Sequence, residues 1–218
     1  MIKYIIFLFL WVVWQPSFAQ DFSFKIGKLK YDGGGDWYAN PTSLSNLFRF
    51  VRQNTTARIS LSEEITDLKS SQLFQYPMLY MTGHGNVVFS EEEVTNLRKY
   101  LLSGGFLHID DNYGLDPYIR REMKKVFPDQ AFVELPFSHE IYHKHYSFPK
   151  GLPKIHEHDN KPAQGFGLFH EGRLICFYTY ECDLGDGWED KSVHNNPEDI
   201  RQRSLQMGTN IILWAIGN

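Results

Sequence analysis

The feature that most constrains the fold is a helix-like segment enclosed between two strand-like segments. Ser90 and Glu93 have the spacing of a capping box, and apolar residues then recur at helical intervals. The pair Gly104-Gly105 ends this segment, because glycine adopts the left-handed conformation without a steric penalty. Apolar runs at residues 75–81 and 106–110 predict the flanking strands. A strand, a helix and a strand joined by short connections are typical of parallel pairing in an α/β protein.

The rest of the chain continues this alternation of strand and helix periods. Further strands are predicted at residues 22–29, 58–61, 131–135, 165–169 and 173–180. Further helices are predicted at residues 41–54, 116–126 and 196–216. Asp116 is the expected N-cap of the second of these, residues 136–164 look irregular, and His170-Glu171-Gly172 predicts an antiparallel hairpin. The expected fold is an α/β three-layer sandwich around a mainly parallel central sheet, with a C-terminal hairpin and helix.

The N-terminus has the pattern of a secretory signal peptide. Lys3 precedes an almost unbroken apolar run, and Ser17-Phe18-Ala19 supplies the small residues that a signal peptidase reads. The apolar run is shorter than the roughly 20 residues that span a bilayer, although an uncleaved or lipid-anchored form is the alternative. We therefore expect a signal peptide at residues 1–19, a single domain at residues 20–218 without a membrane span after cleavage, and a periplasmic or secreted protein.

Charge and cysteine content limit the expected partners and crosslinks. The 218-residue chain has a formal net charge of −4 and no run of basic residues, so nucleic acid is not an expected partner. Cys176 lies within a predicted strand, and six extended residues to Cys182 would span roughly 20 Å. A disulfide needs its Cα atoms within about 7 Å, which only a sharp turn near Glu181 would allow. Two free thiols are therefore predicted.

Two predicted strands end in polar segments that are candidates for ligand binding. In an open parallel sheet, ligands bind at the carboxyl ends of the strands. The candidates from these two strand ends are Gly83, His84, Gly85, Asp110, Asp111, Asn112 and Tyr113. Adjacent carboxylates such as Asp110 and Asp111 need a cation, an arginine or amide donors nearby. The alternative is structural, with Asp110 capping the next turn and Asp111 facing water.

Histidines are concentrated in the irregular second half. His139, Glu140 and His143 have the letters of an H-E-x-x-H zinc motif, but no long amphipathic helix supports them. We consider a divalent metal site formed by Asp110, Asp111, His139 and His143, with solvated loop histidines as the alternative. The polar run at residues 156–159 is interpreted as a surface loop.

An acidic segment follows the last predicted strand. It contains the further ligand-binding candidates Asp183, Asp186, Trp188 and Glu189. The spacing does not fit an EF-hand, which needs acidic ligands at alternate positions and a glutamate at the twelfth. The alternative is a rigid turn whose carboxylates accept backbone N–H bonds while Trp188 packs against the core. Motifs of serine hydrolases, P-loop proteins and dinucleotide-binding proteins are missing from the sequence.

Several motifs together resemble an exported bacterial family that is known only as a domain of unknown function. They are Tyr80–His84, Phe89–Glu93, Leu101–Asp111, Ser138–His143, Gly151–Pro153 and Asp183–Glu189. That family is grouped with the class I glutamine amidotransferase-like proteins, so the resemblance implies a flavodoxin-like fold. In a working glutaminase a nucleophilic cysteine follows the strand that corresponds to residues 106–109, where this chain has Asp110 and Asp111. The resemblance therefore does not imply glutaminase activity.

Three functional interpretations follow. The first is a non-catalytic module that binds a small molecule or an envelope protein on a degenerate amidotransferase-like fold. It predicts a concave pocket at the carboxyl edge, lined by Trp37 or Trp188. The second is a metal-dependent hydrolase that uses an Asp/His cluster, with a divalent metal as cofactor. The third is a structural envelope component. The sequence identifies neither ligand nor cofactor.

Overall fold

A computed structural model describes residues 23–217 of the chain. The signal peptide predicted at residues 1–19 lies outside the described residues. Within the described part, no helix combines the length and the apolar character that crossing a membrane requires.

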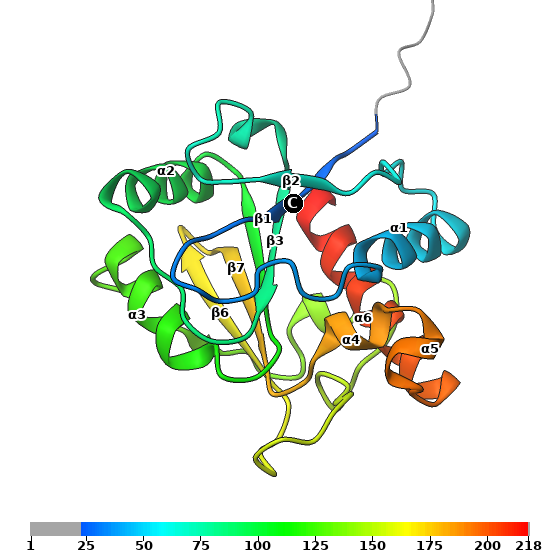
Figure 1. Ribbon diagram of the computed structural model, residues 1–218. Coiled ribbons are helices and arrows are strands. Elements are labelled where there is room, and N and C mark those ends of the chain that lie inside the picture. Colours follow the sequence, from blue (N-terminus) through cyan, green and yellow to red (C-terminus); the bar gives the residue numbers. More distant parts are fainter. Residues whose placement is uncertain (1–22, 218) are drawn as a thin grey trace, which may run out of the picture.

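A mixed sheet forms the centre of the described chain (Figure 1). Its seven strands run in the order β2-β1-β3-β4-β7-β6-β5. The strands are β1 (Ile26–Leu29), β2 (Glu64–Thr66), β3 (Met78–Gly83), β4 (Phe106–Asp111), β5 (Val133–Glu134), β6 (Gln164–His170) and β7 (Arg173–Tyr180). The pairs of β1 with β2 and β3, of β3 with β4, and of β4 with β7 are parallel. Strand β6 is antiparallel to both of its neighbours, β7 and β5.

The sheet is therefore mixed, rather than mainly parallel as predicted. The reason is the predicted hairpin, which the structure confirms. Glu171 and Gly172 reverse the chain between β6 and β7, and both residues have positive φ angles. This tight turn sets β6 antiparallel to β7. Strand β5 then pairs with the free edge of β6, and that pair is antiparallel as well.

Helices cover both faces of the sheet. They are α1 (Ser43–Asn54), α2 (Glu91–Leu102), α3 (Asp116–Val126), α4 (Leu184–Trp188), α5 (Lys191–His194) and α6 (Glu198–Gly217), with short 3₁₀ turns η1 (Leu73–Gln75) and η2 (Glu140–Tyr142). Figure 1 shows α2 and α3 on one side of the strands and α1, α4 and α6 on the other. Two separate hydrophobic cores fill the spaces between these layers. The described chain is thus an α/β/α sandwich.

Some predicted elements change their boundaries in the structure. The strand predicted at residues 58–61 is wrong, because only Ile59 forms an isolated bridge, to Phe24, and strand β2 forms later. The strand predicted at residues 131–135 shortens to the two exposed residues of β5, which pair on one side only. Asp116 is the first residue of α3 and not its N-cap, and its carboxylate binds Arg120 within the helix.

The capping box of α2 is confirmed and provides a stability test. The Ser90 hydroxyl accepts a hydrogen bond from the Glu93 backbone N–H, and the Glu93 carboxylate accepts one from the Ser90 backbone N–H at 2.8 Å. Ser90→Ala is expected to lower the free energy of unfolding by about 1 kcal/mol, measured by urea denaturation. Ser71→Ala, at an exposed position outside the helices, is the control and should change it by less than about 0.5 kcal/mol. Equal effects of both substitutions would contradict the capping role.

Candidate functional site

The candidate site lies at the carboxyl edge of β4 and β7, where two stretches of the chain, residues 156–158 and 183–194, meet. We name it the carboxyl-edge cluster; it consists of His156, His158, Asp183, Asp186, Glu189 and His194. Asp183 is the N-cap of α4, three residues after the end of β7, Asp186 lies within α4, and His194 is the last residue of α5. The irregular chain before β6 supplies His156 and His158.

Asp110 holds the short helix α4 in place at this edge. Its carboxylate is fully buried at the end of β4 and accepts hydrogen bonds from the backbone N–H groups of Leu184 (3.2 Å) and Gly185 (2.6 Å). It also accepts one from the Thr179 hydroxyl at 2.7 Å. Burial raises the pKa of Asp110 to about 7, although the bonds from Thr179 and Gly185 oppose this shift. The structure thus brings Asp110 together with the acidic segment that follows the last strand, and Asp110 is a buried cap of α4.

Asp111 organises the turn that leads into α3. It accepts hydrogen bonds from the backbone N–H groups of Tyr113 (2.9 Å) and Leu115 (3.0 Å) and from the Tyr178 hydroxyl (3.0 Å). Asp111 is only 3% exposed, so the alternative in which it faces water is wrong. Asn112 is also buried, and neither polar atom of its side chain has a hydrogen-bond partner among the described residues.

Three side chains of the cluster come close enough to share one ion. His156, Asp186 and His194 each offer one ligand atom, and these atoms lie within 4.8 Å of one another. His156 Nδ1 is 2.8 Å from Asp186 Oδ2, and His194 Nε2 is 3.7 Å from Asp186 Oδ1. The hydrogen bond to Asp186 is the main cause that raises the pKa of His156. The bond from His156 and the nearby His194 lower the pKa of Asp186, although burial opposes this shift.

Neighbouring polar groups orient these three side chains. Asn196 Oδ1 lies 3.1 Å from His156 Nε2, which directs the Nδ1 atom of the same ring toward Asp186. The Asn40 amide donates a hydrogen bond to Asp186 at 2.9 Å, and Glu189 lies 3.2 Å from His194 Nε2. The Asn196 contact, made to the His156 nitrogen that faces away from Asp186, is of the kind that fixes the ring orientation and the tautomer of a histidine that binds a metal. Glu189 instead contacts the same His194 nitrogen that faces Asp186.

A second histidine–carboxylate pair stands beside this trio. His158 Nε2 is 2.5 Å from Oδ2 of Asp183, and His156 Nδ1 is 3.8 Å from the same oxygen. Asp183 is only 1% exposed, and its other oxygen, Oδ1, has no hydrogen-bond partner among the described residues. Burial raises the pKa of Asp183 to about 6, although the bond from His158 acts in the opposite direction. Tyr113 stacks on the His158 ring at a centroid distance of 4.6 Å.

Unfavourable backbone conformations concentrate around the cluster. Positive φ angles occur at the non-glycine residues Asn40, Tyr113, Glu181, Asp183 and Asn195, each of which lies next to the cluster in space or in sequence. Such conformations cost on the order of 1–3 kcal/mol each, and they tend to occur at functional sites. Their concentration at this edge supports a functional role for it.

Comparison with known proteins identifies the family. The sequence model of a domain of unknown function, DUF4159, matches residues 25–216. The chain belongs to the DUF4159 family. No curated protein matches the chain. Because the match covers almost all of the described chain, it confirms the resemblance to a domain of unknown function, and it assigns no activity to the site.

In this DUF4159 domain, His139 and His143 do not come near Asp110. His139 packs against Trp214 and Phe169, at ring distances of 5.3 and 6.2 Å. Phe169 pairs with Leu174 at the start of β7, whereas Asp110 pairs with Thr179 near its end. Five residues of strand separate these positions, roughly 16 Å. The structure therefore does not assemble the metal site considered for Asp110, Asp111, His139 and His143.

The remaining predicted residues lie at the edge or beneath it. His84 is half exposed and pairs with Asp36, 3.0 Å from its Nδ1 atom. Gly83 has a φ angle of +137°, and a Cβ there would lie 2.3 Å from the Tyr31 hydroxyl, so a side chain cannot be accommodated; Gly85 also has a positive φ angle, in open space. Trp188 is only 1% exposed, and its indole N–H donates to the Ser204 carbonyl. Trp188 therefore belongs to the core, and the prediction that it lines a pocket is wrong.

The histidines of the cluster were not predicted as site residues. The sequence predicts a surface loop at residues 156–159, yet His158 points to the buried carboxylate of Asp183 and His156 to the partly buried carboxylate of Asp186. The one feature of the sequence that could have indicated a site is that His156 and His158 are two residues apart in an irregular segment. The predicted free cysteines are confirmed: Cys176 and Cys182 are both buried and unpaired, and burial raises the pKa of each thiol.

Proposed function

We propose that this chain is an exported module that binds a divalent transition-metal ion at the carboxyl-edge cluster. The observation that carries the proposal is the convergence of His156, Asp186 and His194, whose ligand atoms lie within 4.8 Å of one another. Around a zinc ion, ligand atoms at about 2.0–2.2 Å from the metal are separated by roughly 3.3 Å. His156 Nδ1 lies 2.8 Å from Oδ2 of Asp186, and His194 Nε2 lies 3.7 Å from its other oxygen, Oδ1, so both imidazoles approach the carboxylate to about this separation.

The chemistry and exposure of the three side chains support an open metal site. Imidazole nitrogens and a carboxylate oxygen are ligands that suit zinc and related ions. The side chains of His156 and His194 are 27% and 28% exposed, so solvent or a further ligand can approach them. Three protein ligands leave a fourth position for water or for a small molecule.

We also propose that the fold is flavodoxin-like, and the order of the parallel strands supports this. The parallel strands alone follow the order β2-β1-β3-β4-β7, which is the flavodoxin-like order 2-1-3-4-5. Buried thiols with raised pKa values are poor nucleophiles, and Asp110 occupies the expected position of a glutaminase cysteine. We therefore propose metal binding on an amidotransferase-like fold, without glutaminase activity.

A metal-dependent hydrolase is the second candidate, favoured by one observation. The buried Asp183 lies 3.8 Å from His156 Nδ1 and has one oxygen without a partner among the described residues. A carboxylate in this position is suited to accept a proton from a water molecule at the site.

Zinc titration of the purified protein, free of any histidine tag, tests the proposal. Isothermal titration calorimetry should give a stoichiometry of one Zn²⁺ per chain. His156→Ala and His194→Ala should each weaken binding by about 100-fold, because each removes one of three ligands. The double variant His139→Ala/His143→Ala is the control, since it removes as many imidazoles as the two single variants together, and it should bind zinc as the unaltered protein does.

Two results would overturn the proposal. One is a protein that retains its thermal stability and circular dichroism spectrum but binds no zinc at micromolar to millimolar concentrations. The other is unchanged affinity in His156→Ala or His194→Ala. A loss of zinc binding in the His139/His143 control would instead assign the metal to the opposite end of the sheet.

A further inference from the structure

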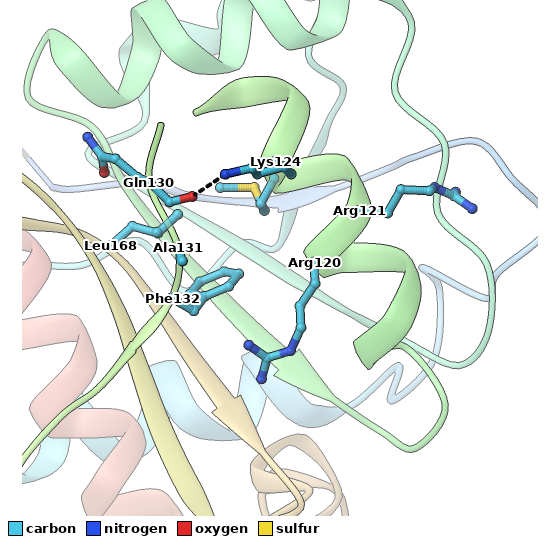
Figure 2. A pocket seen from close by; sticks show the side chains of 8 residues that line it. Arg120, Arg121, Lys124, Gln130, Ala131, Phe132 and Leu168 are labelled. Atoms are coloured by element: carbon cyan, nitrogen blue, oxygen red, sulfur yellow. Dashed lines mark hydrogen bonds between the residues drawn. The ribbon is translucent and has the colours of Figure 1, made fainter. Parts of the chain in front are cut away.

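A pocket lies on the other face of the sheet, between α3 and the chain that enters β5 (Figure 1). Its volume is about 430 Å³, and Figure 2 shows its lining side chains. This volume falls within the range of pockets that hold small organic ligands. None of the carboxyl-edge cluster residues lines it, so it is independent of the proposed metal site.

The pocket combines apolar walls with positive charge. Met123, Phe132 and Leu168 supply apolar surface, and Leu168 and Met123 are themselves buried. The ionisable side chains that line the pocket, Arg120, Arg121 and Lys124, are all cationic. A pocket with only cations is notable in a chain with a formal net charge of −4. The lining therefore fits an anion with an apolar body.

The neighbouring carboxylates neutralise only part of this charge. Arg121 binds Glu122 at 2.7 Å, and its side chain is directed away from Phe132 (Figure 2). Arg120 binds Asp116 at 2.6 Å through its Nε atom. Lys124 has the Gln130 carbonyl, at 3.4 Å, as its hydrogen-bond acceptor. Arg121 and Arg120 are thus each paired with a carboxylate, whereas Lys124 has no carboxylate partner within residues 23–217.

The guanidinium of Arg120 is held in a defined position at the pocket. Its central carbon lies 4.6 Å from the ring centroid of Phe166, 5.5 Å from that of Tyr178 and 5.6 Å from that of Phe132. Asp116, which fixes the Nε side, in turn lies 3.0 Å from the Tyr178 hydroxyl, whose single proton it shares with Asp111. The two terminal nitrogens have no hydrogen-bond partner among the described residues. They offer the paired donors that bind a carboxylate.

We propose that this pocket binds a small organic carboxylate with an apolar body. The apolar part packs on Phe132, Leu168 and Met123, while the carboxylate is bound by Arg120 and attracted by Lys124. An aromatic acid and a medium-length acyl chain share this chemistry, and the choice of probe distinguishes them.

The test is a titration of the isotopically labelled full protein, followed by ¹H–¹⁵N NMR. The probes are 2-naphthoate for aromatic acids, octanoate for acyl chains, and 2-naphthalenemethanol as the uncharged analogue. Ligands of this size are expected to bind with a dissociation constant of about 1 mM or tighter. We expect at least one anionic probe to bind, and the uncharged analogue to bind at least 10-fold more weakly than 2-naphthoate or octanoate.

Charge-removing variants connect this binding to the pocket. Arg120→Gln should weaken binding of the anionic probe by about 10-fold or more. Lys124→Gln should weaken it by about 3-fold; this exposed residue allows a test even if Arg120→Gln fails to fold. Arg203→Gln is the matched control, since Arg203 also stacks on an aromatic ring, that of Phe148 at 4.2 Å, and does not line the pocket.

Three results would overturn the proposal. They are no binding of either carboxylate at 10 mM, equal binding of the uncharged analogue, or unchanged affinity in folded Arg120→Gln and Lys124→Gln variants. Binding of 2-naphthoate alone would identify aromatic acids as the ligand class, and binding of octanoate alone would identify acyl chains. Neither result depends on zinc binding at the other site.

Discussion

Replacing Asp110 by alanine is expected to lower the free energy of unfolding by about 3 kcal/mol. The Asp110 carboxylate accepts hydrogen bonds from the backbone N–H groups of Leu184 and Gly185 at the start of α4. Alanine would leave both donors buried without a partner, and each unsatisfied donor costs roughly 1–3 kcal/mol. Relief from burying a carboxyl group offsets part of this loss, because burial raises its pKa to about 7.

Urea denaturation followed by circular dichroism measures this effect. Asp129→Ala removes an exposed carboxylate and is the matched control, with an expected change below about 0.5 kcal/mol. Asp110→Asn should also destabilise the protein, because one of its two polar atoms becomes a donor that faces donors. If Asp110→Ala were as stable as the control, Asp110 would not be the residue that holds α4.

The second large effect is the pH dependence that His108 gives to stability. His108 is fully buried between the rings of Tyr80, Phe177 and Trp188, and its Nδ1 atom has no hydrogen-bond partner among the described residues. Burial lowers its pKa from 6.5 to about 3. Below pH 6.5 the unfolded chain therefore binds a proton that the folded protein does not bind. This contribution to stability is fully present above pH 6.5 and is lost as the pH falls toward 3.

His108→Phe should remove this dependence. Each pH unit between the two pKa values corresponds to about 1.4 kcal/mol, so the variant should gain about 3 kcal/mol relative to the unaltered protein between pH 7 and pH 4.5. The difference between the two proteins is the quantity to measure, by urea denaturation at each pH. This difference is needed because Asp110 acts in the opposite direction in both proteins. Its raised pKa makes the free energy of unfolding fall as the pH rises from about 4 to 7.

A control separates His108 from histidines in general. His170→Phe changes a partly exposed histidine at the β6–β7 turn, and it is the control for replacing a histidine by phenylalanine, measured in the same way. A constant difference between His108→Phe and the unaltered protein would show that His108 is protonated equally in the folded and unfolded states, and would contradict the prediction.

His108 and Asp110 belong to one buried network beneath the candidate site. His108 Nε2 lies 3.1 Å from the Thr179 hydroxyl, which donates to Asp110 at 2.7 Å. Asp110 in turn binds the start of α4, the helix that contains Asp186. Core residues of β4 and β7 thus determine where a proposed metal ligand lies. Weakened zinc binding in a folded Asp110 variant would be the functional consequence of this connection.

Elements whose signals are local could be predicted from the sequence. The capping box of Ser90 and Glu93 and the turn at Glu171-Gly172 depend on contacts within a few residues, so neighbouring side chains already specify them. The predicted helix at residues 196–216 corresponds closely to α6 for the same reason. The mixed sheet was harder to predict, because strand pairing joins residues that are distant in the chain and periodicity alone does not give the direction of pairing.

The candidate site also combines features that local sequence predicts with features that depend on contacts between distant residues. Asp110, Asp183 and Asp186 follow predicted strands, and this position in the chain is enough to predict that they approach one edge of the sheet. Their roles depend on contacts that form only on folding, because the donors that bind Asp110 lie 74 and 75 residues further along the chain. The same is true of His156 and His194, which become neighbours of Asp186 only when α4 packs at the ends of β4 and β7. A carboxylate becomes a cap or a metal ligand according to which donors surround it, and that is a property of packing.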